Sequence, residues 1–237
     1  MASCAPPLGG KARRRVVRPR SRKSRILGLL PSWLVTTRLP ARGRRLFLTF
    51  DDGPDPEHTP RVLDLLGQHG AKASFFLVGD QAVRHPGIVR RIVAEGHAIG
   101  NHSWSHPLMT SLPLSEQLHE IDRTDEALAA FDGRKRHLFR PPSGALPFKL
   151  LLHFARERRT LAYWSYDSHD YARLPAQALL PKIRSRPPRA GDVVLMHDDN
   201  RETTEVLARL LPEWTRQGYV VQAMPAPVPR RAEVEGA

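Results

Sequence analysis

The stretch LFLTFDDGPDPEHTP, residues 46–60, sets the pattern that the rest of the chain repeats. Its apolar, β-rich beginning predicts a short buried strand, and the turn-forming residues after it end that strand. Thr59 and Pro60 then supply the N-cap and the first position of a helix that closes on Gly70. A buried strand that passes through a turn into a helix is the repeating unit of parallel α/β folds.

Further apolar runs continue this alternation along the chain. Strands separated by helices predict a parallel sheet that is covered by helices. The strands span about 180 residues, somewhat fewer than a full eight-stranded barrel needs, so we expect an α/β fold of the deformed (β/α)7 barrel type. A doubly wound open sheet is the alternative, although no Gly-x-Gly-x-x-Gly turn follows the first strand. The strands are predicted at residues 46–50, 73–79, 97–102, 137–142, 160–168, 192–198 and 219–224. The main helices are predicted at 60–70, at 81–96 with Pro86 either inside the helix or at a restart, and at 115–131, 147–158, 175–186 and 202–217.

The positive charge of the chain is confined to its N-terminus. The formal net charge is +13, yet residues 1–45 hold 13 Lys and Arg with no Asp or Glu, and residues 46–237 hold 24 of each kind. We therefore predict a basic, flexible arm over 1–45, a folded domain over 46–224 and a disordered Pro-rich tail over 225–237. No aromatic residues interrupt the arginine cluster, so we expect no specific nucleic-acid partner. Contact of the arm with an anionic membrane surface is the alternative to a free arm.

Cysteine content and hydropathy restrict the class of protein further. The single cysteine, Cys4, excludes a disulfide framework and any Cys-rich zinc module. No run of 18 apolar residues occurs, and the early apolar stretch at 26–35 is interrupted by Pro31 and lacks a small-residue cleavage site. We therefore expect a cytoplasmic or membrane-proximal protein. A periplasmic or secreted protein is the alternative if Met1 is not the true start.

Ionisable residues follow five of the predicted strands. The carboxyl ends of parallel strands form one edge of the fold, where active sites of α/β proteins lie. Five strands that direct such groups to one edge are more than chance placement explains. The residues are Asp51 and Asp52, then His102 and His106, then Arg140, then Asp167 and Asp170, and finally His197 and Asp198.

These residue types suit metal-assisted hydrolysis. His102 and His106 are four positions apart, a spacing that lets two imidazoles reach one metal ion, with a carboxylate as the usual third ligand. Consecutive strand residues point to opposite sides, so one of Asp51 and Asp52 could bind the metal while the other accepts a proton from water. Breakdown of the tetrahedral intermediate then needs an acid, for which His197 is the natural candidate.

Five motifs in order give the sequence a resemblance to a known family. They are TFDDGP (49–54), HSWSH (102–106), RPPSG (140–144), DSHDY (167–171) and LMHD (195–198). Over about residues 46–224 the chain resembles the polysaccharide deacetylases, the NodB-homology group known as carbohydrate esterase family 4. The resemblance implies a deformed seven-stranded β/α barrel, in agreement with the strand pattern.

The resemblance also implies a role for each motif. Asp51 would be the catalytic base, held and tuned by Arg140, and His197 would be the general acid. Asp170 is favoured over Asp167 as the carboxylate that orients His197. The metal ligands would be Asp52, His102 and His106, and the divalent ion would be zinc, with cobalt as a substitute.

Three further residues would shape the substrate pocket. The resemblance implies that the backbone N–H of Ser143 forms part of the oxyanion hole, and that Leu195 and Tyr171 line the pocket for the acetyl methyl group. The family usually has an aromatic residue in place of Ser143 and Trp in place of Tyr171. We expect these departures to spare the chemistry and to alter the groove that binds the substrate.

The expected activity is hydrolysis of the linear amide of N-acetylglucosamine-containing glycans, which gives acetate and a free amino sugar. The glycan could be a chitin-like oligosaccharide, peptidoglycan or a lipid-linked glycan. Two alternatives stay open: an O-acetyl esterase acting on acetylated polysaccharide, and a non-catalytic glycan-binding protein of the same fold. The second alternative predicts loss of Asp51, His197 or a metal ligand, and this sequence retains all of them.

Overall fold

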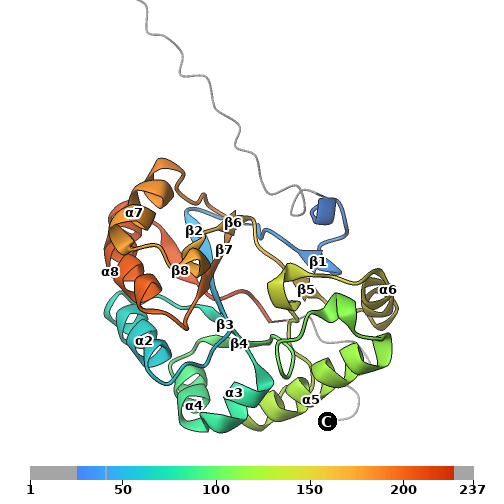
Figure 1. The fold of residues 1–237 in the computed structure, drawn as a ribbon. Helices are drawn as coiled ribbons and strands as arrows, with labels where there is room; N and C mark the ends of the chain where they lie inside the picture. The colour runs from blue at the N-terminus through green and yellow to red at the C-terminus, as the bar shows by residue number, and fades with distance from the viewer. Residues whose placement is uncertain (1–25, 41, 227–237) are drawn as a thin grey trace, which may run out of the picture.

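A parallel sheet built around one strand forms the centre of the molecule (Figure 1). The computed structural model describes residues 26–40 and 42–226. Strand β2 (Arg45–Asp51) pairs in parallel with β3, β7 and β8, and the order in the sheet is β4-β3-β2-β7-β6. The other strands of this sheet are β3 (Ser74–Leu77), β4 (Ala98–Asn101), β6 (Tyr166–Asp167), β7 (Val193–His197) and β8 (Val220–Gln222).

One segment, residues 160–168, closes this sheet into a deformed barrel. Its first part is β5 (Leu161–Ala162), which bridges Phe139, and Phe139 in turn bridges Asn101 at the end of β4. Its second part is β6, which pairs with β7 on the opposite side of the ring. The predicted barrel is thus confirmed. The predicted strand at 137–142 is reduced to the bridging residue Phe139, and the one predicted at 160–168 is split in two.

A short strand that the sequence did not predict lies before β2. Strand β1 (Val35–Thr36) pairs with β5, and Leu34 and Val35 are buried in the same apolar cluster as Phe139. These residues belong to the segment that we predict as a basic arm, so part of that segment packs on the barrel. The boundary at residue 45 stays a prediction, because residues 1–25 lie outside the described part of the chain, as does most of the predicted tail.

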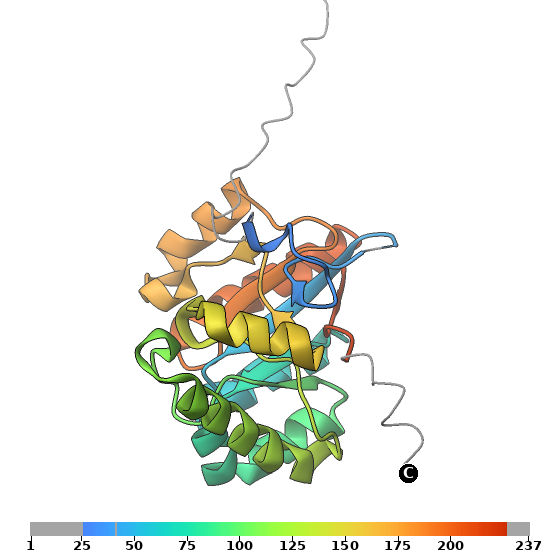
Figure 2. The ribbon, with the colours of Figure 1, turned by 90° about the vertical axis from the view of Figure 1, so that its right-hand side faces the viewer.

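Helices surround the strands on the outside (Figures 1 and 2). The helix predicted over 60–70 starts at His58, one residue before the predicted N-cap, because Asp55 Oδ1 accepts from the N–H groups of Glu57 and His58, while the Thr59 hydroxyl donates to Asp198. The helix predicted over 81–96 is two helices, the second of which starts at Pro86, where the missing N–H costs nothing. The helices are α2 (His58–Gln68), α3 (Gly79–Arg84), α4 (Pro86–Ala94), α5 (Leu114–Asp132), α6 (Phe148–Glu157), α7 (Ala176–Ser185) and α8 (Arg201–Arg216), with 3-10 turns η1 (Met109–Ser111), η2 (Pro142–Gly144) and η3 (Asp170–Ala172).

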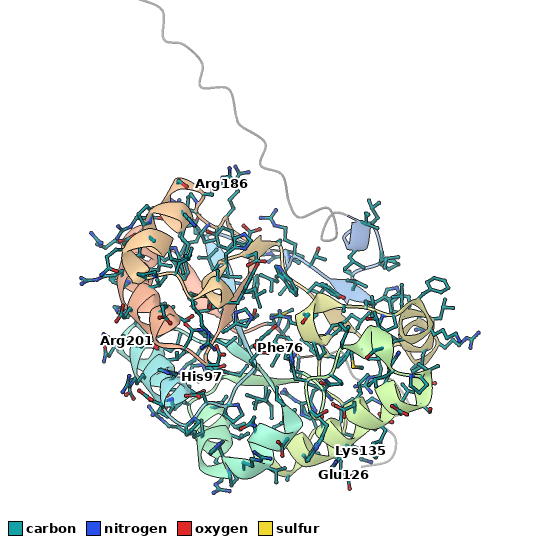
Figure 3. The ribbon with its side chains drawn as sticks, viewed as in Figure 1. Phe76, His97, Glu126, Lys135, Arg186 and Arg201 are labelled. Carbon is teal, nitrogen blue, oxygen red and sulfur yellow. The ribbon has the colours of Figure 1, made fainter. Side chains whose placement is uncertain are left out.

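The alternation of side chains along β2 divides the core into two parts. Leu46, Leu48 and Phe50 pack with apolar residues of the surrounding helices α2 and α8. Phe47 belongs to a separate cluster with Phe76, which lies near the centre of the ring in Figure 3. Apolar side chains therefore fill the interior of the barrel, and polar residues occupy the carboxyl ends of the strands. Across the part of the chain that is described, no helix is both long and apolar enough to cross a membrane.

Candidate active site

Three predicted metal ligands come together at the carboxyl edge of the barrel. Asp52 follows β2, and His102 and His106 follow β4. Asp52 Oδ1 lies 3.3 Å from His102 Nε2 and 3.2 Å from His106 Nε2. Asp52 and His106 have φ angles of 74° and 56°, so both side chains leave left-handed turns. These turns direct side chains from two strands to one point.

This donor set fits a divalent metal ion. One ligand atom from each residue lies within 4.8 Å of the others. Zinc–ligand bonds of 2.0–2.1 Å in a tetrahedron separate the ligand atoms by about 3.3 Å, close to the separations observed. His102 Nδ1 lies 2.7 Å from the carbonyl oxygen of Arg140 and must donate to it, which leaves Nε2 free to coordinate. Burial alone would raise the pKa of Asp52, but hydrogen bonds from His102 and His106 lower it well below its usual range, so this ligand is ionised.

The second carboxylate, Asp51, is held by a wholly buried arginine. Arg140 Nη1 donates to Asp51 Oδ1 at 2.6 Å and to Thr49 Oγ1 at 2.9 Å. The guanidinium lies 4.0 Å above the ring of Phe76. Burial lowers the pKa of Arg140, and the charge of Asp51 opposes that shift. Asp51 Oδ2 lies 3.8 Å from His102 Nε2, so this oxygen faces the metal ligands while Oδ1 is held.

His197 lies beside Asp51 at the barrel edge, because the two residues are partners in the register of the adjacent strands β2 and β7. Its Nδ1 is 2.9 Å from Asp170 Oδ1, and its backbone N–H donates to Asp170 Oδ2 at 2.7 Å. Burial alone would lower the pKa of His197, but the hydrogen bond and charge of Asp170 raise it to about 9. The ring is therefore protonated at neutral pH and can donate a proton from Nε2.

Of the two candidate carboxylates, Asp170 carries the contacts to His197. It also accepts hydrogen bonds from Ser168 Oγ at 2.7 Å and from Thr203 Oγ1 at 2.6 Å. Asp167 instead accepts from the backbone N–H of His169 at 2.9 Å. The preference for Asp170 agrees with this geometry.

The three predicted pocket residues lie at different depths. Leu195 is buried in β7, two positions before His197 and therefore on the same side of the strand. Ser143 lies in η2 at a φ of 53°, in a turn held by Tyr163, whose hydroxyl donates to Gly144 O at 3.0 Å. The ring of Tyr171 is exposed and lies edge-on to the ring of His197, with 5.7 Å between the two ring centroids. Tyr171 therefore flanks His197 at the surface.

A buried carboxyl that sequence reasoning left without a role lies beneath the metal ligands. Asp198 is fully buried and accepts a hydrogen bond from Thr59, and burial raises its pKa to about 7. A Cβ on Gly53 would lie 2.7 Å from Cγ of Asp198, so the turn that carries Asp52 rests on this carboxyl. Nothing in the local sequence signals this contact, because its partners are 139 residues apart.

A second buried network supports the histidine loop. Asn101 Oδ1 accepts from the N–H of Ser103 at 2.9 Å, and Asn101 Nδ2 donates to Asp125 Oδ1 at 2.8 Å. Arg159 donates to the other oxygen of Asp125 at 2.6 Å. Sequence reasoning missed this support. It also missed Thr49, although Thr49 is two residues before Asp51 and therefore on the same side of β2.

A parallel barrel with an Asp–His–His group, a carboxylate and an imidazole at the carboxyl edge of its strands has the arrangement of a metal-dependent hydrolase. Residues 38–156 match the family model described as polysaccharide deacetylase. The chain therefore belongs to the polysaccharide deacetylase family, as the motifs indicate.

Relatives with known structure or name agree with this membership. A peptidoglycan-N-acetylglucosamine deacetylase of Bacillus cereus is 35% identical over 207 residues, 81% of this chain and 91% of the relative. A chitooligosaccharide deacetylase of Sinorhizobium fredii is 30% identical over 195 residues, 76% of this chain and 90% of the relative. The structure of the Bc1960 peptidoglycan N-acetylglucosamine deacetylase, bound to a hydroxamate, superposes with a TM-score of 0.75 at 32% identity, over 81% of this chain and 91% of the other.

Proposed function

We propose that this protein removes acetyl groups from N-acetylglucosamine units of a glycan and releases acetate and a free amino sugar. The observation that carries the proposal is the pairing of a carboxylate and an imidazolium on neighbouring strands. Asp51 offers one oxygen as a base beside the metal ligands, and His197 offers a proton from an imidazolium. Relatives named for peptidoglycan and for chitooligosaccharides support an N-acetylated glycan as the substrate.

Each residue has a defined task in the reaction. Asp51 takes a proton from the attacking water through Oδ2, because Arg140 engages Oδ1. The water oxygen bonds to the acetyl carbon, and the backbone N–H of Ser143 donates to the carbonyl oxygen as it gains negative charge. His197 then gives its Nε2 proton to the sugar nitrogen, and the C–N bond breaks.

The protonated state of His197 favours an amide over an ester substrate. An amide nitrogen leaves only after it has been protonated, whereas the alkoxide of an ester can leave with less assistance. Asp170 keeps His197 protonated up to about pH 9, where its pKa lies. A protonated His197 meets the greater need of an amide for acid assistance, and the named relatives act on N-acetylated glycans, so we infer that N-deacetylation is the main activity.

Asp52, His102 and His106 would hold the metal ion. When bound there, a divalent ion supplies Lewis-acid chemistry, which lowers the pKa of water and polarises the acetyl carbonyl. Two imidazoles and one carboxylate with an open position suit catalytic zinc, and cobalt can take the same ligands. We propose zinc as the ion.

Acetate release tests the proposal directly. The panel holds N-acetylglucosamine oligomers, peptidoglycan and acetylated xylan, each incubated with zinc, with cobalt and after chelation. Asp51→Asn removes the base but leaves the metal ligands, and Asp64→Asn is the matched control, since Asp64 lies on α2 away from the site. We expect metal-dependent release from an N-acetylated glycan, a loss of about 10³-fold in Asp51→Asn, and no change in Asp64→Asn.

The other outcomes separate the alternatives. Release from acetylated xylan but from no N-acetylated glycan would identify an O-acetyl esterase. Tight binding of a glycan with no acetate release, in a protein that holds stoichiometric metal, would identify a binding protein of the same fold. Activity that is unaffected by chelation or by Asp51→Asn would refute the mechanism.

A further inference from the structure

Exposed apolar side chains gather on one face of the barrel. Among the described residues, nine large apolar side chains are exposed, and four of them, on α3, on η3, on β8 and in the loop before η1, lie singly. The other five lie on α6 and on the segment before β1. They are Ile26, Leu29, Trp33, Phe148 and Leu152, with exposed fractions of 67%, 86%, 49%, 71% and 42%, and we call them the apolar face.

Two packed elements hold this face together. Leu27 and Leu34 share an apolar cluster with Leu150 and Phe154 of α6, so each element buries one side and exposes the other. The hydroxyl of Thr160, three residues after α6, donates to the carbonyl oxygen of Trp33 at 2.7 Å. Figure 2 shows α6 running across the side of the barrel, with the segment that leads into β1 beside it.

Positive charge accompanies the apolar face. Residues 11–25, which directly precede Ile26, contain nine Lys and Arg, and residues 1–45 contain no acidic residue. On α6, Lys149 and Arg156 are exposed beside the apolar side chains. The one acidic residue of α6, Glu157, is paired with Arg136 at 3.4 Å.

An anionic lipid surface uses both properties at once. A nucleic acid would pair with the arginines but would leave the exposed Leu29 and Phe148 in water. A protein partner could cover the apolar side chains but would need no cluster of nine cations. In a bilayer that contains anionic lipids, apolar side chains enter the headgroup region, tryptophan prefers that depth, and cations pair with phosphates.

We propose that the apolar face and the preceding cationic segment dock this protein on an anionic phospholipid bilayer. Helix α6 begins at Phe148, four residues after the η2 turn that carries Ser143 at the barrel mouth. Docking therefore holds the mouth beside the membrane surface and favours glycans that lie there. The proposal does not depend on the activity, because its test measures binding to lipid alone.

Sedimentation with vesicles tests the docking. The full chain is mixed with vesicles of phosphatidylcholine alone or with 30 mol% phosphatidylglycerol, a composition of about one anionic lipid in three. The triple variant Ile26→Ser, Leu29→Ser, Trp33→Ser removes three of the five side chains of the apolar face. The matched control, Val83→Ser with Leu108→Ser, removes two exposed apolar side chains elsewhere. A third variant replaces the nine Lys and Arg of residues 11–25 by Gln.

We expect binding to the anionic vesicles to be at least about tenfold tighter than to the neutral ones. The triple Ser variant and the Gln variant should each weaken it by about tenfold or more, and the control should bind as the parent chain does. Circular dichroism and stoichiometric zinc binding verify that each variant is folded. The fluorescence of the parent chain should shift to the blue on binding, and Trp33→Phe should reduce that shift.

Several results would overturn the proposal. Equal binding to neutral and anionic vesicles would remove the role of charge, and unchanged binding by the triple Ser variant would remove that of the apolar face. Tighter binding to a duplex DNA fragment than to the vesicles would identify a nucleic acid as the partner. A dimer in sedimentation equilibrium that the triple Ser variant abolishes would identify a second copy of the chain as the occupant.

Discussion

His197 and His106 face the same site but are held in different ways. His197 ends a strand, and Asp170 accepts hydrogen bonds from both its ring and its backbone N–H. His106 lies in a left-handed turn, and 37% of its side chain is exposed. The acid side of the site is thus complete within the chain. On the metal side, Asp52, His102 and His106 direct one oxygen and two nitrogen atoms to the same point, where a cation would complete the arrangement.

His102 is intermediate between these two histidines. It is buried as His197 is, and the carbonyl oxygen of Arg140 fixes its ring, yet it belongs to the metal side. Through Arg140 it is also connected to Asp51, the proposed base. Burial and hydrogen bonding of the histidine rings therefore increase from His106, the exposed metal ligand, through His102 to His197.

The largest effect should come from removing the buried metal ligand. His102→Ala removes a ligand that is held in place before the ion binds, so we expect zinc affinity to fall by about 10³-fold and acetate release to be lost. His106→Ala removes a ligand whose ring is less restrained, and we expect a smaller fall, about 10²-fold. Competition titration with a zinc chelator measures both, and equal losses would contradict the proposed order within the site.

The next largest effect should come from the acid side. Asp170→Asn removes the charge that raises the pKa of His197 to about 9, so His197 would lose its proton at lower pH. We expect acetate release at pH 8 to fall by about 10²-fold. The alkaline limb of the pH profile should shift to a lower pH than in the parent enzyme. Asp167→Asn, in the same motif, should leave the limb in place. Zinc affinity should be unchanged in both variants.

A smaller effect on stability should come from the carboxyl beneath the metal side. The pKa of Asp198 is about 7 in the folded protein against an ordinary value of 3.8, so the folded state binds a proton more tightly than the unfolded state does. Its contribution to stability is present below pH 4 and is lost as the pH rises to 7. Asn does not ionise, so Asp198→Asn lacks this loss. We expect its free energy of unfolding, relative to that of the parent, to be about 2 kcal/mol more favourable at pH 8 than at pH 5. Urea unfolding at both pH values measures the difference, and a constant difference would show that Asp198 is ionised throughout.

The smallest effect should come from Tyr171, which flanks His197 without a hydrogen bond to it. Its hydroxyl bonds to His169 Nδ1 at 2.8 Å, and its ring contacts His197 edge-on. Tyr171→Phe keeps the ring, so we expect kcat to stay within about threefold of the parent and KM for a short oligomer to change little. Tyr171→Ala removes the ring and should raise KM more than it lowers kcat. A large loss of kcat in Tyr171→Phe would place the hydroxyl in the proton-transfer path.

The parts of the fold and site that could be predicted are those with local signals. Apolar runs located β2, β3, β4 and β7, because buried parallel strands are short and continuous in sequence. The ionisable residues at their ends were then close in space by the geometry of a parallel sheet. Strand β1 could not be predicted, because it is two residues long and lies in a basic segment. The Thr59–Asp198 and Thr203–Asp170 contacts had no signal either, since each joins distant parts of the chain.

The segment that closes the barrel has a consequence for the order in which the protein becomes active during synthesis. The metal ligands all lie within residues 52–106, whereas the carbonyl oxygens of Ala162 and Tyr163 help to hold Arg140 against Asp51, and the acid pair comes from residues 170 and 197. The N-terminal half of a growing chain therefore carries Asp51 and the three proposed metal ligands before Arg140, Asp170 and His197 exist. The site is complete only after residues 160–168 have closed the barrel and His197 has been added.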